Sequence, residues 1–160
     1  MFKQISFFII AVLSGILLLL FVQCSSNRPQ QGFSEIPHAI WQKGQTVDFE
    51  FELTKPLEKG RILLAVRHAT VIPYSDLPIL YALTKPNSQP QAAKLNLKIK
   101  DAAGENLGSG MGDMWDLEQE LEAPMQMPSG KYSLKIAHGL ETDALLISEV
   151  GYIVEDLTEK

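Results

Sequence analysis

The sequence predicts an all-β protein: a single antiparallel β-sandwich of about seven or eight strands, jelly-roll or immunoglobulin-like, behind an N-terminal lipoprotein signal. Apolar and polar residues alternate with a period of two in several short segments, as on strands with one buried face. Turns that contain Pro and Gly separate those segments. No second change of composition follows Gln45, so the chain of 160 residues has room for one folded domain.

The first half of the domain is expected to contain four strands. In TVDFEFEL (46–53), apolar residues alternate with acidic ones, which predicts one dry and one wet face. RILLAVRH (61–68) is apolar on both faces for most of its length and suits a central strand. PILYALT (78–84) follows a proline and is rich in β-forming residues, and AKLNLKIKD (93–101) repeats the alternation.

The second half is expected to contain three more strands. DLEQELEAP (116–124) fits both helical and strand spacing, and we favour a strand because its neighbours are strands. Pro124 is expected to close this element in either case. GKYSLKIAH (130–138) and SEVGYIVED (148–156) alternate cleanly and complete the set.

The N-terminus is expected to carry a membrane signal over residues 1–23. Ile5 to Val22 contains no charge and would span about 27 Å as a helix, close to the bilayer core of about 30 Å. An A-x-A cleavage site is missing before Cys24, the only cysteine, and the segment resembles a bacterial lipoprotein signal. An uncleaved anchor stays open as an alternative, because Gln23 replaces the small residue that normally precedes the cysteine.

The next segment, 24–35, is polar and lacks periodicity, so it is expected to be a tether, with the sandwich domain over 36–160. Fatty acyl chains such as palmitate on Cys24 would attach the protein to the membrane, and stable attachment needs more than one chain. Ser25 stands where an Asp would retain some lipoproteins in the inner membrane. We therefore expect an outer-membrane lipoprotein that faces the periplasm.

Composition argues against several function classes. The formal net charge of −5 gives no attraction to phosphate backbones, so nucleic-acid binding is not expected. A lone cysteine excludes an intramolecular disulfide and a cysteine-based zinc site. The three histidines, His38, His68 and His138, are not at helical ligand spacing, and we expect structural roles rather than a metal site.

Two acidic or glycine-rich motifs have ordinary structural explanations. GSGMGD (108–113) lacks the Lys-Ser/Thr ending of a phosphate loop, and Ser109 is not framed as a hydrolase nucleophile. It is expected to be a glycine-rich turn or bulge, with partner binding as the alternative. The alternating Glu118, Glu120 and Glu122 are expected to form the solvated face of a strand. We therefore expect no catalytic residues, no cofactor and no enzymatic activity.

Five segments match a known family in their order along the chain: IPHAIWQKGQTVDFEFE (36–52), PYSDL (73–77), GSGMGDMWD (108–116), MPSGKYSLKIAH (127–138) and VGYIVE (150–155). Together they resemble the gliding-motility lipoproteins of the Bacteroidetes, the GldH family. The resemblance covers nearly all of residues 33–156. It implies an envelope lipoprotein that supports gliding, type IX secretion machinery or both by binding or stabilising partner envelope lipoproteins.

The resemblance also assigns positions. Cys24 matches the family's lipidated cysteine, while Trp41, Tyr74, Asp113 and Trp115 match recurrent motif positions and are candidates for partner contact. The alternative is a carbohydrate- or ligand-binding sandwich, in which the rings of Trp41, Tyr74 and Trp115 would be stacking platforms. That alternative requires the three rings to be exposed on one concave surface.

Overall fold

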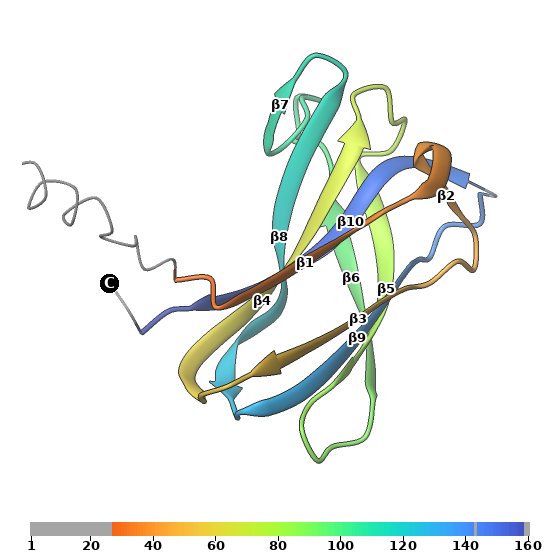
Figure 1. Cartoon of the computed structure of the whole chain (residues 1–160). Helices are drawn as coiled ribbons and strands as arrows, with labels where there is room; N and C mark the ends of the chain where they lie inside the picture. Colours follow the sequence, from red (N-terminus) through yellow and green to blue (C-terminus); the bar gives the residue numbers. More distant parts are fainter. Residues whose placement is uncertain (1–26, 143, 159–160) are drawn as a thin grey trace, which may run out of the picture.

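The computed structural model describes residues 27–142 and 144–158, which form two antiparallel sheets packed face to face (Figure 1). The strands in this part of the chain are β1 (Gln30–Glu35), β2 (Ile40–Gln42), β3 (Val47–Leu53), β4 (Leu57–Ala69), β5 (Asp76–Thr84), β6 (Gln91–Lys98), β7 (Ser109–Met111), β8 (Met114–Met127), β9 (Gly130–His138) and β10 (Ala144–Asp156). A short 3₁₀ turn, Pro37–Ala39, connects β1 to β2.

The strand order identifies the sandwich as a jelly roll. The larger sheet has the order β1-β10-β4-β8-β7, with β2 also paired to β10, and the smaller sheet has the order β3-β9-β5-β6. In an immunoglobulin fold the first two strands are neighbours in one sheet. Here the first strand lies beside the last, and the eight long strands form two four-stranded layers in the orders β1-β10-β4-β8 and β3-β9-β5-β6, as in a jelly roll.

All seven strands expected from the sequence are present, and the expected all-β sandwich is confirmed. The ambiguous segment 116–124 belongs to β8, a strand of 14 residues. Pro124 does not end this strand, contrary to expectation. The register between β4 and β8 shifts around Gly60, so Pro124 lies where the regular ladder is already interrupted and needs no N–H donor there.

The polar segment expected to be a tether is partly a strand. Gln30–Glu35 form β1 and pair along their full length with β10, so the expectation of a tether through residue 35 is wrong for these residues. The sequence QQGFSE gave no strand signal because β1 is an edge strand with only partly buried residues. Its pairing depends on a partner strand more than 100 residues away in sequence.

Between the sheets, the core contains a row of aromatic rings. Phe51 of β3 stacks on Tyr132 of β9, with ring centroids 4.9 Å apart, and on Tyr152 of β10, at 4.7 Å. Phe49 meets Tyr152 edge-on at 5.1 Å. Each such pair adds about 0.5–1.5 kcal/mol beyond the area that it buries. The row joins the two sheets, because Phe51 and Tyr132 belong to the smaller sheet and Tyr152 to the larger.

Glycines make room for aromatic rings at the β1 edge. Gly32 pairs with Tyr152, and a Cβ at Gly32 would lie 2.6 Å from the ring carbon Cε1 of that tyrosine. In the next pair the roles are reversed, since Phe33 lies over Gly151, where a Cβ would meet the Phe33 ring at 2.3 Å. Rings that cover glycines on a neighbouring strand help to fix the register of an edge strand.

Glutamine side chains join the open edges of the two sheets. The amide of Gln30 in β1 donates to the backbone oxygen of Glu52 in β3, at 3.0 Å. On the other side Gln119 of β8 accepts from the backbone N–H of Lys98 at 2.9 Å and donates to the carbonyl of Asn96 at 3.2 Å. These contacts satisfy backbone groups at the β3 and β6 edges that would otherwise be available to another strand.

The glycine at position 32 can be tested by adding a single methyl group. Gly32→Ala should lower the free energy of unfolding by about 1–3 kcal/mol, because the new Cβ would overlap the Tyr152 ring. Gln31→Ala, on the exposed side of the same strand, should change it by less than about 0.5 kcal/mol. Urea denaturation of both variants measures the difference, and equal stability would show that the tyrosine ring moves freely aside.

Candidate functional site

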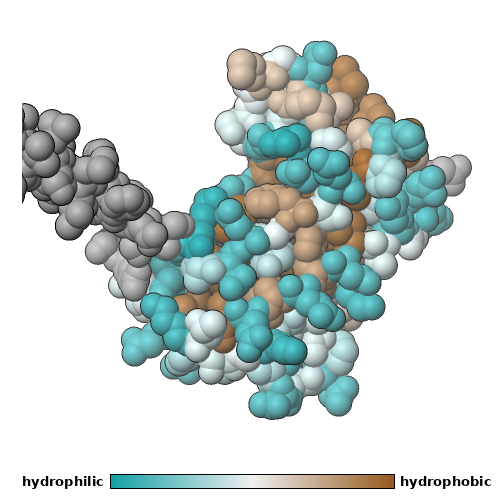
Figure 2. All heavy atoms as spheres, viewed as in Figure 1, coloured by the Kyte–Doolittle hydropathy of each residue, from teal (hydrophilic) through white to brown (hydrophobic). Residues whose placement is uncertain are grey.

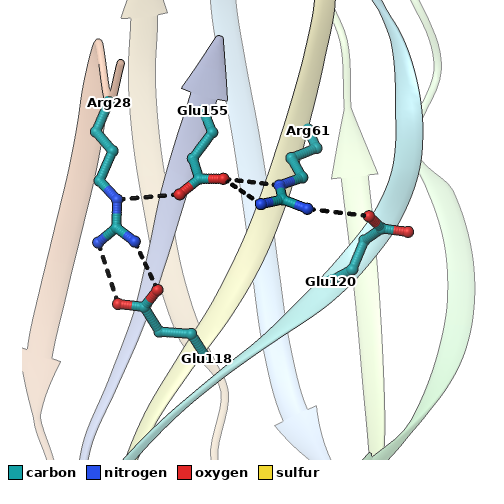
Figure 3. A network of polar contacts seen from close by, with 5 residues as sticks. All are labelled: Arg28, Arg61, Glu118, Glu120 and Glu155. Atoms are coloured by element: carbon teal, nitrogen blue, oxygen red, sulfur yellow. Dashed lines mark hydrogen bonds and ion pairs between the residues drawn. The ribbon is translucent and has the colours of Figure 1, made fainter. Parts of the chain in front are cut away.

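Arg28, near the start of the described residues, belongs to a network of charged side chains (Figure 3). The guanidinium of Arg28 donates two hydrogen bonds to Glu118 of β8, at 3.1 and 2.7 Å. Its Nε donates to Glu155 of β10, at 3.1 Å. The hydrogen bond to Glu118 raises the pKa of Arg28 above its ordinary value, against the opposing effect of partial burial. Arg28 therefore stays charged and joins the start of the domain to two strands.

Glu155 is the centre of this network. Its second carboxylate oxygen accepts from Nε and Nη2 of Arg61, at 2.7 and 2.6 Å, while Arg61 also lies 3.8 Å from Glu120. The carboxylate of Glu155 is almost fully buried, with 7% of its side chain exposed. Two guanidinium groups and several hydrogen bonds compensate the loss of hydration that this burial entails.

The network lies beside a small apolar cluster on the outer face of the larger sheet. Leu63, Ala65 and Ile153 are buried there and separate from the main core. By strand alternation, Arg61 is on the same face as Leu63, and Glu155 is on the same face as Ile153. The aliphatic parts of long charged side chains can cover such residues while the charged ends pair with each other.

The end of the molecule with the β7–β8 hairpin carries part of the motif GSGMGDMWD. Gly112, at φ +70°, and Asp113 form the two-residue turn between Met111 and Met114. The indole of Trp115 lies over Gly110, where a Cβ would be 2.6 Å from the ring. The expectation of a glycine-rich turn is therefore confirmed for Gly112 and Asp113, whereas Ser109–Met111 of the same motif form the strand β7.

Two apolar side chains are strongly exposed at this end: Met111 at 92% and Val71 at 75%. The two loops that carry them are joined, because Thr70 donates from its backbone N–H to Asp113 O at 2.8 Å and from its hydroxyl to Gly112 O at 3.2 Å. Figure 2 shows tan and brown atoms gathered at the same upper end. We call Val71, Met111 and Asp113 the apolar tip.

The four candidate contact residues do not form one surface. Trp41 is fully buried, donates to the carbonyl of Gln45 at 3.0 Å and meets His138 edge-on at 5.4 Å. Tyr74 is partly buried and packs against the core. Asp113 is exposed and Trp115 half-buried, both in the β7–β8 hairpin.

The burial of Trp41 argues against the alternative of a carbohydrate- or ligand-binding sandwich. Three exposed rings on one concave face were required, and one of them is inside the core. That stacking platform is therefore not formed. The sequence could not show this, because a tryptophan in a short edge segment fits a contact residue and a core residue equally well.

A shallow hollow of about 460 Å³ lies on the outer face of the larger sheet. Phe33, 47% exposed, and Ala65 contribute its apolar lining. Arg67 lies at its rim, 2.7 Å from Asp116 and 3.8 Å from Glu149. Sequence analysis missed Phe33 because it assigned this residue to the tether, although a lone aromatic in a polar stretch was a usable signal.

The histidines lie in separate environments. His38 is exposed, with φ +58°, whereas His68 and His138 are buried. Within residues 27–142 and 144–158, no cluster of three or more His, Cys, Asp or Glu residues has the arrangement of a metal site.

Cys24 lies outside the described residues. Among those that are described, no helix has the length and apolarity to cross a membrane.

Taken together, these features define the class as a jelly-roll domain whose first residues are bound to its last strand. The family model for the GldH lipoprotein matches residues 30–154, and the chain belongs to that family. It is therefore a lipoprotein associated with gliding motility, and the family places it in the cell envelope with a lipid anchor. A comparison with curated proteins gave no significant match.

Solved structures give distant similarities. The infectious bursal disease virus VP2 subviral particle has a TM-score of 0.36 at 15% identity over 78% of this chain, which spans 29% of the viral chain. The Yersinia pseudotuberculosis-derived mitogen has a TM-score of 0.34 at 11% identity, covering 82% of this chain and 90% of that one. TmCBM61, solved with β-1,4-galactotriose, has a TM-score of 0.30 at 9% identity, covering 80% and 86%. Scores this low carry no argument about function.

The central role of Glu155 can be tested by comparing the stability effects of replacing Glu155 and Glu120, which both contact Arg61. Glu155→Gln should lower the free energy of unfolding by about 1–3 kcal/mol, because two partly buried guanidinium groups would lose their buried carboxylate. Glu120→Gln should change it by less than about 1 kcal/mol, since Glu120 is 43% exposed and 3.8 Å from Arg61. Thermal unfolding at low and moderate salt measures both; equal effects would contradict the central role.

The buried His138 predicts a pH dependence of stability. Burial lowers its pKa, and the backbone groups of Gln42 and Trp41, which are near the ring but form no hydrogen bond of good geometry with it, oppose this only in part. Below pH about 6.5 the unfolded chain therefore binds this proton more tightly than the folded chain does, so stability falls as the pH decreases towards the lowered pKa. The loss from this group is at most about 1.4 kcal/mol per pH unit.

His138→Leu should remove this component, so that its stability changes less than that of the unchanged protein between pH 7 and 5. The substitution should be tolerated because neither ring nitrogen has a hydrogen-bond partner within the described part of the chain. His38→Ala, at an exposed histidine, is the matched control and should keep the full pH dependence. Identical pH profiles for His138→Leu and the unchanged protein would contradict the prediction.

Proposed function

We propose that this protein is attached by acyl chains on Cys24 to the outer membrane, facing the periplasm, and supports gliding or type IX secretion machinery by binding partner envelope lipoproteins. The family match over residues 30–154 is the observation that carries this proposal. The role is binding and stabilisation of partners rather than catalysis.

The apolar tip is the surface proposed for the partner. Met111 and Val71 are exposed side chains that a partner can bury, and the Thr70 hydrogen bonds hold their two loops together before binding. A contact surface that is already ordered loses less conformational entropy when it binds. Asp113 adds one exposed charge beside these apolar side chains.

The packing of Trp115 supports this assignment. Its ring lies over Gly110 and so fixes the hairpin from the inner side. Trp115 is therefore proposed to position the tip, while Met111, Val71 and Asp113 contact the partner. In the motif GSGMGDMWD (108–116), the glycines then serve the turn, the Trp115 ring supports it and Asp113 supplies an exposed carboxylate.

Genetic replacement in the native bacterium tests the proposal. Deleting the gene should impair gliding or type IX secretion and deplete at least one partner lipoprotein, and Cys24→Ser should reproduce the defect. Mass spectrometry of the unchanged protein should find a mature chain that starts at acylated Cys24. Unchanged motility, secretion and envelope protein levels after deletion would refute the proposed role.

A surface variant separates the proposed contact from general loss of folding. Met111→Asp should reduce co-purification of the partner at least tenfold, whereas Leu80→Asp, at a side chain 45% exposed on β5, should not. Both variants must unfold at temperatures close to that of the unchanged protein. Equal co-purification of the two variants would exclude the apolar tip as the partner surface.

A further inference from the structure

The N-terminal segment is bound to the folded domain from Asn27 onward, within a few residues of the proposed anchor at Cys24. The backbone N–H of Asp156 donates to the carbonyl of Asn27 at 2.7 Å, and Arg28 is bound by Glu118 and Glu155. Only Ser25 and Ser26 separate Cys24 from Asn27. Sequence alone suggested a tether of twelve residues, but most of that segment is bound to the domain.

This attachment limits how far the domain can move from the membrane. A fully extended chain spans at most about 3.6 Å per residue, so the Cα atom of Asn27 lies within about 11 Å of that of Cys24. If the apolar segment through Val22 is retained instead, the corresponding limit is about 18 Å. The sandwich is much longer than either, because β8 alone has 14 residues and spans about 43 Å.

One end of the sandwich must therefore lie near the lipid. Leu157 donates from its backbone N–H to the carbonyl of Lys59 at 2.8 Å, which places the start of β4, directly after the β3–β4 turn, beside the end of β10. In Figure 1 this corner lies at the lower left, and the β7–β8 hairpin lies at the upper end. The exposed Lys59 belongs to this corner, where its charge can meet lipid phosphates, while the exposed Lys55 at the same corner lies close to Asp156.

We infer that the Arg28 network makes this a short-tether protein, whose corner around Asn27, Lys55 and Lys59 rests on the phospholipid headgroups. The apolar tip then points away from the membrane. This inference rests on the proposed membrane attachment but holds for either form of anchor. The ion network then orients the domain on the membrane, and this orientation determines which end of the sandwich a partner can reach.

Fluorescence quenching on vesicles tests the orientation. The full-length protein, matured in the bacterium, is reconstituted into phosphatidylcholine–phosphatidylglycerol vesicles with a quencher on some lipid headgroups. Dye is attached to a single introduced cysteine, either Lys59→Cys or Met111→Cys. We expect quenching at position 59 to be at least threefold stronger than at position 111. Equal quenching at the two positions would overturn the inference.

Two changes test whether the short tether sets the orientation. Arg28→Ala removes the ion pairs that hold the start of the chain, so that β1 from Gln30 becomes the first firmly held segment, and a twelve-residue Gly-Ser insertion after Ser26 lengthens the tether without altering the domain. Each should reduce the ratio of quenching by at least half. Arg67→Ala is the matched control, because Arg67 is a comparably exposed arginine on the same sheet, paired with Asp116. A ratio that the insertion leaves unchanged would refute the short tether.

The sole native cysteine separates this test from that of the anchor. In the protein without an introduced cysteine, an acylated Cys24 takes up no dye, whereas a free thiol does. Dye uptake at Cys24 together with a high quenching ratio would refute acylation and leave the orientation standing. Acylation together with equal quenching would do the reverse.

Discussion

The pairing of the first strand with the last is the constraint on which the rest of this structure depends. β10 lies between β1 and β4 in the larger sheet and also pairs with β2. Its Tyr152 fills the space above Gly32 and stacks on Phe51 of the other sheet, so one residue links the edge strand to the core. Its Glu155 binds Arg28 and Arg61. The same strand, β10, thus sets the register of β1, contributes to the core and binds the start of the described chain.

The edges of the sandwich show how the domain avoids pairing with other strands. β1 and β3 lie at one open side, where Gln30 binds a carbonyl of β3, and Gln119 of β8 binds both a donor and an acceptor of β6 at the other. These contacts leave fewer backbone groups available for another chain. This disfavours a partner that adds a strand to either edge and agrees with the proposal that a partner contacts exposed side chains of the apolar tip.

The local pattern of apolar and polar residues was sufficient to predict the long strands, but it did not predict the edge strands or the candidate site. Alternation such as VDFEFEL identifies β3 because its inner residues must be buried whatever their partner. β1, β2 and β7 are short or polar and form only because β10 and β8 offer partners. Arg28 and Glu155 are 127 residues apart, so their pairing could not be seen in sequence spacing. Trp41 was misjudged because burial depends on tertiary packing.

The same topology links membrane attachment to completion of folding. Until β10 has been made and has entered the sheet, Asn27 and Arg28 have neither Asp156 nor Glu155 to bind, and β1 has no neighbour. With the proposed attachment at Cys24, an incompletely folded chain would be attached through a long segment and the folded one through Ser25 and Ser26 alone. The shortening of the tether is then a consequence of folding itself. In the proposed arrangement, the network that stabilises the last strand also keeps the domain close to the membrane, with its opposite end directed away from it.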